Sequence, residues 1–179
     1  MPRYKGAPIV IVRSRLRDLG SSAEEQVRQN LSPAARQTLD TLLATAWAPI
    51  DQIEEIFVHA APVLHPNAAD PAYALGVELG HEMLSGVYRF VARVVSVPFL
   101  IEQTAALWSR YQDTGVASAE QTGPRSAVLR VREHPTFPPT VRRTVSGWLV
   151  SAIERTGAQN VRVTDGGSMT CWEWSITWR

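Results

Sequence analysis

The stretch Met169-Thr-Cys-Trp-Glu-Trp-Ser-Ile-Thr-Trp178 decides how the C-terminal region of the chain can fold. Side chains of a strand alternate between two faces, and one face of this strand carries Trp172, Trp174, Ile176 and Trp178. The opposite face carries Cys171, Glu173, Ser175 and Thr177. A tryptophan ring buries roughly 150–250 Å², so a face with three of them cannot stand in water. It must meet a helix, the N-terminal half, a ligand or a partner.

Two hairpins are predicted in residues 116–179, before and after one helix. The first pairs residues 116–121 with residues 127–133, where apolar and polar side chains alternate with the period of a half-buried strand. The second begins at Val161, and the sequence Asp165-Gly-Gly-Ser168 is expected to form its turn. The C-terminal region is therefore predicted to be a ββαββ module.

The helix between the hairpins is predicted to start at Pro138 and to end near Gly157, which takes a left-handed conformation without strain. Its apolar stripe consists of Val141, Val145, Trp148, Leu149, Ala152 and Ile153. Arg142 and Arg143 fall on the polar side and are expected to be solvated. Packing of the stripe on the sheet would bury Trp148.

Residues 1–115 are predicted to be helical, with one helix ending near Gly20 and a short one following it. Further helix starts are expected at Ser32-Pro33, Trp47-Ala-Pro49, Asp70-Pro71 and Val97-Pro98. Helices followed by a small antiparallel sheet are typical of the α+β class. We expect one domain over residues 1–179, with a helical N-terminal segment over residues 1–48, a helical layer over residues 49–115 and the module over residues 116–179.

Composition limits the possible partners and the location. The chain has 179 residues and a formal net charge of +1, which gives no electrostatic attraction to nucleic acid or to an anionic membrane. No apolar run reaches the length of a membrane span or of a signal-peptide core. The sequence therefore predicts a cytoplasmic protein with no nucleic-acid partner and no membrane partner.

The residues that could bind a metal or catalyse a reaction are few. Glu78 and His81 have the Glu-x-x-His spacing of carboxylate-bridged metal sites, but no second copy exists, so a solvated helix face with a local Glu–His hydrogen bond is favoured. A single cysteine, Cys171, cannot build a thiolate metal cluster. Acid–base chemistry by Glu78 and His81 with Tyr88 and Arg89 has no nucleophile to complete it. We predict no metal, no cofactor and no enzymatic activity, although haem needs only one histidine and is not excluded by counting.

Aromatic side chains are the strongest indication of a binding site, because they line most small-molecule pockets. They gather in the C-terminal half and in the helix before it, where they form either a pocket or a core. The candidate ligand-binding residues are Tyr88, Arg89, Trp108, Tyr111, Trp148, Trp172 and Trp174.

Three motifs carry a resemblance to a known family: Ser85-Gly-Val-Tyr-Arg-Phe90, Val97-Pro-Phe99 and Leu107-Trp-Ser-Arg-Tyr111. With Trp47-Ala-Pro49 and the ending Trp174-Ser-Ile-Thr-Trp-Arg179, they resemble an uncharacterised paralogous domain family of myxobacteria. That family is distantly similar to ligand-sensing domains of the 4-vinyl reductase and haem-NO-binding type. The resemblance implies helices packed on a small antiparallel sheet and a binding role in signalling.

One departure from the 4-vinyl reductase pattern concerns metal. Cysteines around the last hairpin can hold zinc there, whereas Trp172 stands here at the final cysteine position and Cys171 points to the opposite face. The resemblance therefore carries over neither a zinc site nor a haem-ligating histidine.

These observations lead to two functional hypotheses. The first is a non-enzymatic bacterial signalling domain that binds a small apolar or aromatic ligand, or a protein partner, between the helices and the aromatic sheet. The alternative is a structural homodimerisation module that uses the tryptophan-rich last strand as its interface.

Overall fold

The computed structural model describes residues 1–84, 96–169 and 171–179. Its helices are α1 Ala7–Leu19, α2 Ser21–Gln29, α3 Pro33–Thr41, α4 Ile50–Leu64, α5 Pro71–Met83, α7 Val97–Tyr111 and α8 Pro139–Glu154. Its strands are β1 Arg3–Lys5, β2 Trp47–Pro49, β3 Val116–Gly123, β4 Ser126–Arg132, β5 Arg162–Ser168 and β6 Cys171–Thr177. The predicted α+β class is confirmed. Among the described residues, no helix is long and apolar enough to cross a membrane.

The helix starts follow from local capping chemistry. The side chains of Ser32, Asp70 and Ser96 accept hydrogen bonds from backbone amides in the first turns of α3, α5 and α7. In each case a proline stands within the first two helical positions, where its missing N–H costs nothing. Cap and proline together place three of the predicted helix starts correctly.

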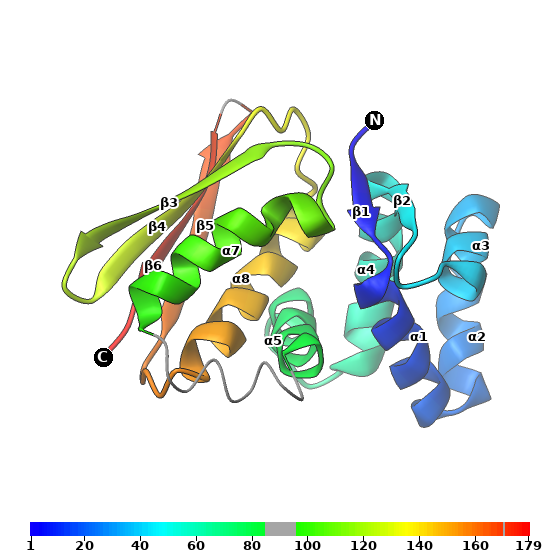
Figure 1. The fold of residues 1–179 in the computed structure, drawn as a ribbon. Coiled ribbons are helices and arrows are strands. Elements are labelled where there is room, and N and C mark those ends of the chain that lie inside the picture. Colours follow the sequence, from blue (N-terminus) through cyan, green and yellow to red (C-terminus); the bar gives the residue numbers. More distant parts are fainter. Residues whose placement is uncertain (85–95, 170) are drawn as a thin grey trace.

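The C-terminal module is a four-stranded antiparallel sheet with the strand order β3-β4-β6-β5. Helices α7 and α8 lie on the same side of this sheet, while α1 to α4 form the opposite half of the molecule and α5 lies between the two groups (Figure 1). The register pairs Leu129 with Trp174 and Val163 with Ile176. All four side chains are buried, so this face of the sheet forms one side of the hydrophobic core.

Two predictions about local structure differ from the structure. Trp47–Pro49 form the strand β2, which pairs with β1 so that Tyr4 faces Ala48, and the predicted helix begins directly after them at Ile50. Asp165–Ser168 do not form the second turn, because β5 continues to Ser168 and pairs with β6. Gly167 has a φ of 98°, and a Cβ there would overlap the backbone of Cys171. The glycine therefore serves a close approach of two strands and not a reversal of the chain.

Helices α5 and α8 cross at backbone contact distance. A Cβ at Gly76 of α5 would overlap the carbonyl oxygen of Thr144, and a Cβ at Gly147 of α8 would overlap the carbonyl oxygen of Tyr73. Only glycine fits at either position, so no side chain separates the two backbones where the helices cross.

The tryptophan-rich face is buried at Trp174 and Ile176, while Trp172 and Trp178 are half-buried. The ring of Trp174 is fully buried and lies 6.3 Å from Trp108 and 5.6 Å from Phe137, measured between ring centroids. Its indole nitrogen donates a hydrogen bond to the carbonyl oxygen of Arg142. This strand is therefore part of the core.

Arg142 is not solvated as expected. Its guanidinium pairs with Asp165 at 2.9 Å and lies 4.9 Å from the ring centroid of Trp172. Arg143 and Ser146 also donate hydrogen bonds to Asp165. Burial alone would raise the pKa of the Asp165 carboxyl, but these three hydrogen bonds lower it below its ordinary value.

Candidate functional site

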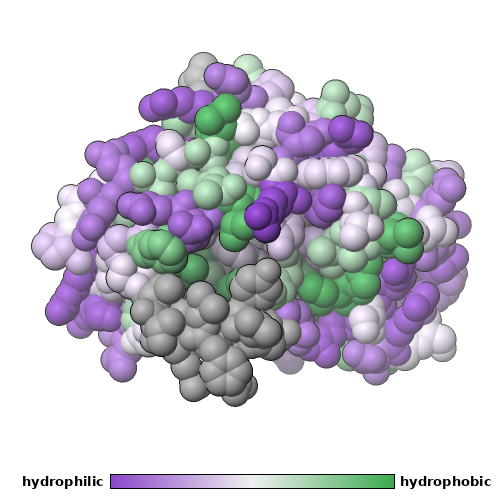
Figure 2. All heavy atoms as spheres, viewed as in Figure 1, coloured by the Kyte–Doolittle hydropathy of each residue, from purple (hydrophilic) through white to green (hydrophobic). Residues whose placement is uncertain are grey.

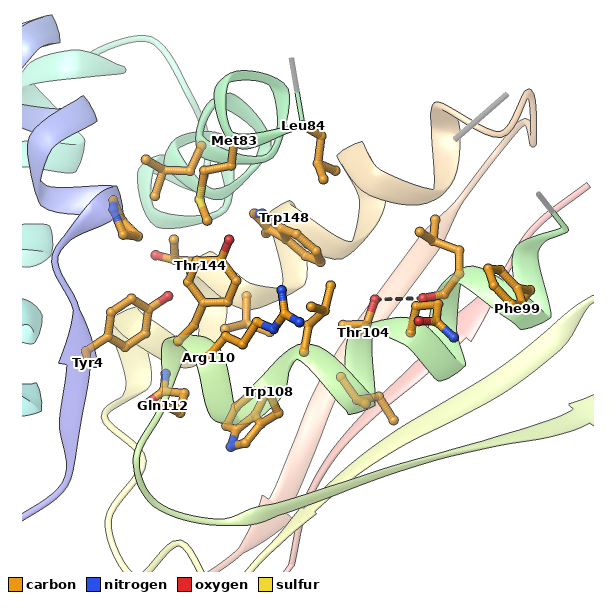
Figure 3. Close-up of a pocket in the computed structure, with 18 residues that line it drawn as sticks. Tyr4, Met83, Leu84, Phe99, Thr104, Trp108, Arg110, Gln112, Thr144 and Trp148 are labelled. Atoms are coloured by element: carbon orange, nitrogen blue, oxygen red, sulfur yellow. Dashed lines mark hydrogen bonds between the residues drawn. The ribbon is translucent and has the colours of Figure 1, made fainter. Parts of the chain in front are cut away.

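A cavity of about 430 Å³ lies between α5, α7 and α8. Its walls are mostly apolar, and the apolar residues from the three helices and their ends are Leu79, Met83, Leu84, Phe99, Leu100, Leu107, Trp108, Val145 and Trp148. Figure 3 shows Met83 of α5, Thr104 of α7 and Trp148 of α8 pointing toward the same space. The hydroxyl of Thr104 donates a hydrogen bond to the carbonyl oxygen of Leu100, so it needs no partner inside the cavity. The volume falls in the range of small-molecule sites, roughly 300–1,000 Å³.

Hydrophobic side chains also reach the surface near this cavity. On the face shown in Figure 2, they lie over α7 and beside α5, among many hydrophilic ones. Phe99 at the start of α7 is 46% exposed, which is unusual for so large an apolar side chain.

One end of the cavity is polar. Tyr4 of β1 and Gln112 after α7 face each other through an isolated antiparallel bridge, and both side chains line the cavity. Arg110 and Tyr111 of α7 complete this end. Burial, with a smaller contribution from Tyr111, raises the pKa of the Tyr4 phenol far above its ordinary value. Tyr4 is therefore a neutral hydrogen-bond donor at physiological pH.

Two buried polar atoms that line or adjoin the cavity have no hydrogen-bond partner among the described residues. They are Oε1 of Gln112 and Nε1 of Trp148. Gln112 as a whole is only 3% exposed. Because buried polar groups are nearly always paired, these atoms indicate a ligand or ordered water in the cavity.

The structure brings together three of the candidate residues proposed from the sequence. Trp108, Tyr111 and Trp148 line the cavity. Trp174 and Trp172 do not, since Trp174 packs in the core and the indole of Trp172 donates to the carbonyl oxygen of His134 at 2.8 Å. The other two candidates, Tyr88 and Arg89, lie outside the described residues, and the candidate set as a whole stays a prediction.

Sequence reasoning missed Tyr4, Arg110 and Gln112 at the polar end. A signal for the cavity was present in α7, whose apolar side chains occupy two sides of the helix. Ile101 is buried in the core, whereas Leu100 and Leu107 face the cavity. A helix that is apolar on two sides has two layers to contact.

The metal-like pair Glu78 and His81 is engaged in ion pairs and hydrogen bonds. Glu78 binds Arg15 at 2.7 Å and His65 at 3.1 Å, and not His81 as the local hydrogen bond would require. His81 instead contacts Arg155. Among the described residues, no group of three or more histidine, cysteine or acidic side chains is arranged to hold a metal ion.

Comparison with known proteins gives a likeness at the level of fold. No protein-family model matches the chain, and no curated protein matches its sequence. Among solved structures it resembles an Fe(II) unliganded H-NOX protein mutant from K. algicida, with a TM-score of 0.68, 9% identity, and coverage of 98% of this chain and 96% of the other. The chain has the H-NOX fold. An H-NOX protein from S. oneidensis in the Fe(II)NO state has a TM-score of 0.67 and 14% identity, with coverage of 98% of this chain and 99% of the other. An oxygen-binding H-NOX domain related to soluble guanylate cyclases has a TM-score of 0.64 and 10% identity, with coverage of 98% of this chain and 95% of the other.

At the level of fold, these neighbours agree with the resemblance to haem-NO-binding domains seen in the sequence. The likeness to the myxobacterial family and to 4-vinyl reductase domains stays a prediction.

Two other structures with this fold were studied for the distortion of their haem. The question is therefore whether the residues that line the cavity of this chain could hold haem iron. Haem iron is most often held by histidine or cysteine thiolate. The chain has four histidines, His59, His65, His81 and His134, and none is among the described residues that line the cavity. Cys171, its only cysteine, pairs with Arg132 at the start of β6 and does not line the cavity either. The cavity does not fit a haem held by imidazole or thiolate.

Proposed function

We propose that this protein is a non-enzymatic signalling domain that senses a small apolar ligand bound in the cavity between α5, α7 and α8. The observation that carries the proposal is the mainly apolar cavity of about 430 Å³. Two of its lining residues, Gln112 and Trp148, each have a buried polar atom with no hydrogen-bond partner among the described residues. The H-NOX fold supports a sensing role, because a related domain is described as oxygen-binding and related to soluble guanylate cyclases. The absence of histidine and cysteine from the described lining favours an organic ligand over haem.

The ligand hypothesis is favoured over a dimer built on the last strand. A dimer interface of this kind would need the rings of β6 at the surface. Trp174 and Ile176 are instead buried under the chain's own helices. We also propose that residues 1–179 form one domain of a cytoplasmic protein that belongs to the myxobacterial family. A protein partner would receive the signal.

The proposal can be tested by filling the cavity. In Thr104→Phe the new ring occupies the space between α7 and α8 and leaves no buried group unpaired, because the lost hydroxyl only bonded its own helix. Ala106→Phe is the matched control, since Ala106 is exposed on the same helix and does not line the cavity. The probe is 1-decanol, and the signal is the change in intrinsic tryptophan fluorescence, to which Trp108 and Trp148 contribute from the lining of the cavity.

We expect the unmodified protein and Ala106→Phe to bind 1-decanol with a dissociation constant of about 1–10 µM, near −8 to −7 kcal/mol. Thr104→Phe should bind at least tenfold more weakly at an unchanged thermal midpoint. Equal affinity of all three proteins, or no fluorescence change in any of them, would overturn the proposal.

A further inference from the structure

The cavity is elongated and its two ends differ chemically. It follows α7 from Phe99 to Gln112, about 20 Å at 1.5 Å per helical residue. The end near Phe99 and Leu100 is mainly apolar, with Gln103 as a neutral polar exception, and the end near Arg110 and Gln112 is polar and charged. A ligand that matches this surface has a long hydrocarbon body and one polar head.

Arg110 indicates the charge of that head. It is the only charged residue among the described residues that line the cavity. Figure 3 shows its side chain extending from α7 into the cavity. No ion pair joins Arg110 to a carboxylate in the portion of the chain that the structure describes. Its position in the last turn of α7 also offsets the helix dipole, but that role does not require a cavity-facing guanidinium.

Gln112 and Tyr4 provide neutral partners beside this cation. The amide of Gln112 can present either its oxygen or its NH₂ group, because the two orientations have the same shape. The oxygen Oε1 has no hydrogen-bond partner among the described residues, and leaving a buried polar atom unpaired is unfavourable. In the opposite orientation the NH₂ group takes that place and donates to an oxygen of a ligand, which removes this cost. The neutral phenol of Tyr4 is held next to it by the bridge between the two residues.

We propose that the ligand is an elongated amphipathic acid whose carboxylate binds Arg110, Gln112 and Tyr4 while its hydrocarbon chain lies along α7 toward Phe99. The inference rests on the proposed function and adds the class of the ligand. A carboxylate suits this end because its two oxygens accept hydrogen bonds from the planar guanidinium and from a neighbouring neutral donor at once. Arg110 is exposed as well as lining the cavity, so the charged head keeps access to water.

The test compares two probes of equal chain length, decanoate and 1-decanol, at pH 8 and low salt. Decanoate should bind about tenfold more tightly than 1-decanol, which corresponds to about 1.4 kcal/mol. Arg110→Met should abolish this preference by weakening decanoate about tenfold and leaving 1-decanol unchanged. Arg110→Lys should retain some of it, because the charge remains while the planar fork is lost.

Arg162→Met is the matched control. Arg162 is exposed on β5 and does not line the cavity, so its replacement removes one positive charge from the protein without touching the site. Its affinities should equal those of the unmodified protein.

The possible outcomes separate the two proposals. Equal affinity of the unmodified protein for both probes, or an Arg110→Met variant that still prefers decanoate, would overturn the acid-binding inference and leave the apolar site standing. Failure of both probes to bind would overturn the proposed function itself.

Discussion

Two neighbouring regions of the molecule differ in how helices meet. Helices α5 and α8 touch through Gly76 and Gly147, where no side chain separates the backbones. Helix α7 faces the same pair of helices with larger residues such as Phe99 and Leu107, and a cavity of about 430 Å³ remains between them. The comparison shows that the residues at a helix crossing, and not the helices themselves, determine whether the space between them is closed.

The largest expected effect contrasts a tryptophan of the closed core with one beside the cavity. Trp174→Ala should lower the free energy of unfolding by about 3–5 kcal/mol, because its ring is fully buried. Trp148→Ala should cost only about 1–2 kcal/mol, because Trp148 is half-buried and lines empty space. From sequence alone, packing of the helix stripe on the sheet would have buried Trp148 and given its replacement the larger cost of about 3–5 kcal/mol.

Urea denaturation of both variants checks this contrast. If Trp148→Ala lowers the free energy of unfolding as much as Trp174→Ala does, the region around the cavity is packed as tightly as the core.

A smaller effect is expected at the glycine crossing. Gly76→Ala should destabilise the protein by about 2 kcal/mol or more, since the added methyl group overlaps a backbone carbonyl and outweighs the better helix propensity of alanine. Gly166→Ala is the control, because a Cβ at that position meets nothing within 4 Å. Thermal or urea midpoints that fall equally in both variants would contradict a closed α5–α8 contact.

The smallest expected effect is a change of stability with pH that depends on the buried side chain of His134. His134 is buried against Phe137, with ring centroids 4.7 Å apart, and burial lowers its pKa despite opposing effects of nearby backbone groups and of Asp113. In the unfolded chain a histidine titrates near 6.5. Below that pH the unfolded state binds more protons than the folded state, so stability falls until the lower folded pKa is reached.

The measurement is the urea midpoint between pH 8 and pH 5 for the unmodified protein and for His134→Gln. The unmodified protein should lose more stability than the variant below about pH 6.5. Parallel curves would show that His134 has the same pKa in both states.

Much of the fold could be predicted because it depends on local patterns. Alternation in β6 identified the buried face of the strand, and cap-plus-proline pairs such as Asp70-Pro71 located helix starts. The strands β1 and β2 were missed because three residues are too few to show a period, and their pairing joins residues more than forty positions apart. Gly166-Gly167 suggested a turn because the sequence does not show when a glycine serves close strand contact.

The candidate site was only partly predictable. Trp108, Tyr111 and Trp148 were proposed from their aromatic rings, and all three line the cavity. Arg110 reads in sequence as an ordinary basic residue at a helix end, and Gln112 as a linker residue. Both lie near Tyr4 because a bridge joins residues 4 and 112. Such a pairing of distant residues cannot be predicted from a local sequence pattern.

The glycine contact between α5 and α8 also determines which wall of the cavity can respond to its contents. Backbone atoms that already touch cannot adjust by changing rotamers, so these two helices form a fixed unit. Helix α7 is held at a distance by side chains, and it packs on β3, an edge strand of the sheet. An occupant of larger volume would therefore displace α7 and carry β3 with it, so that ligand size is converted into a shift of the sheet's edge.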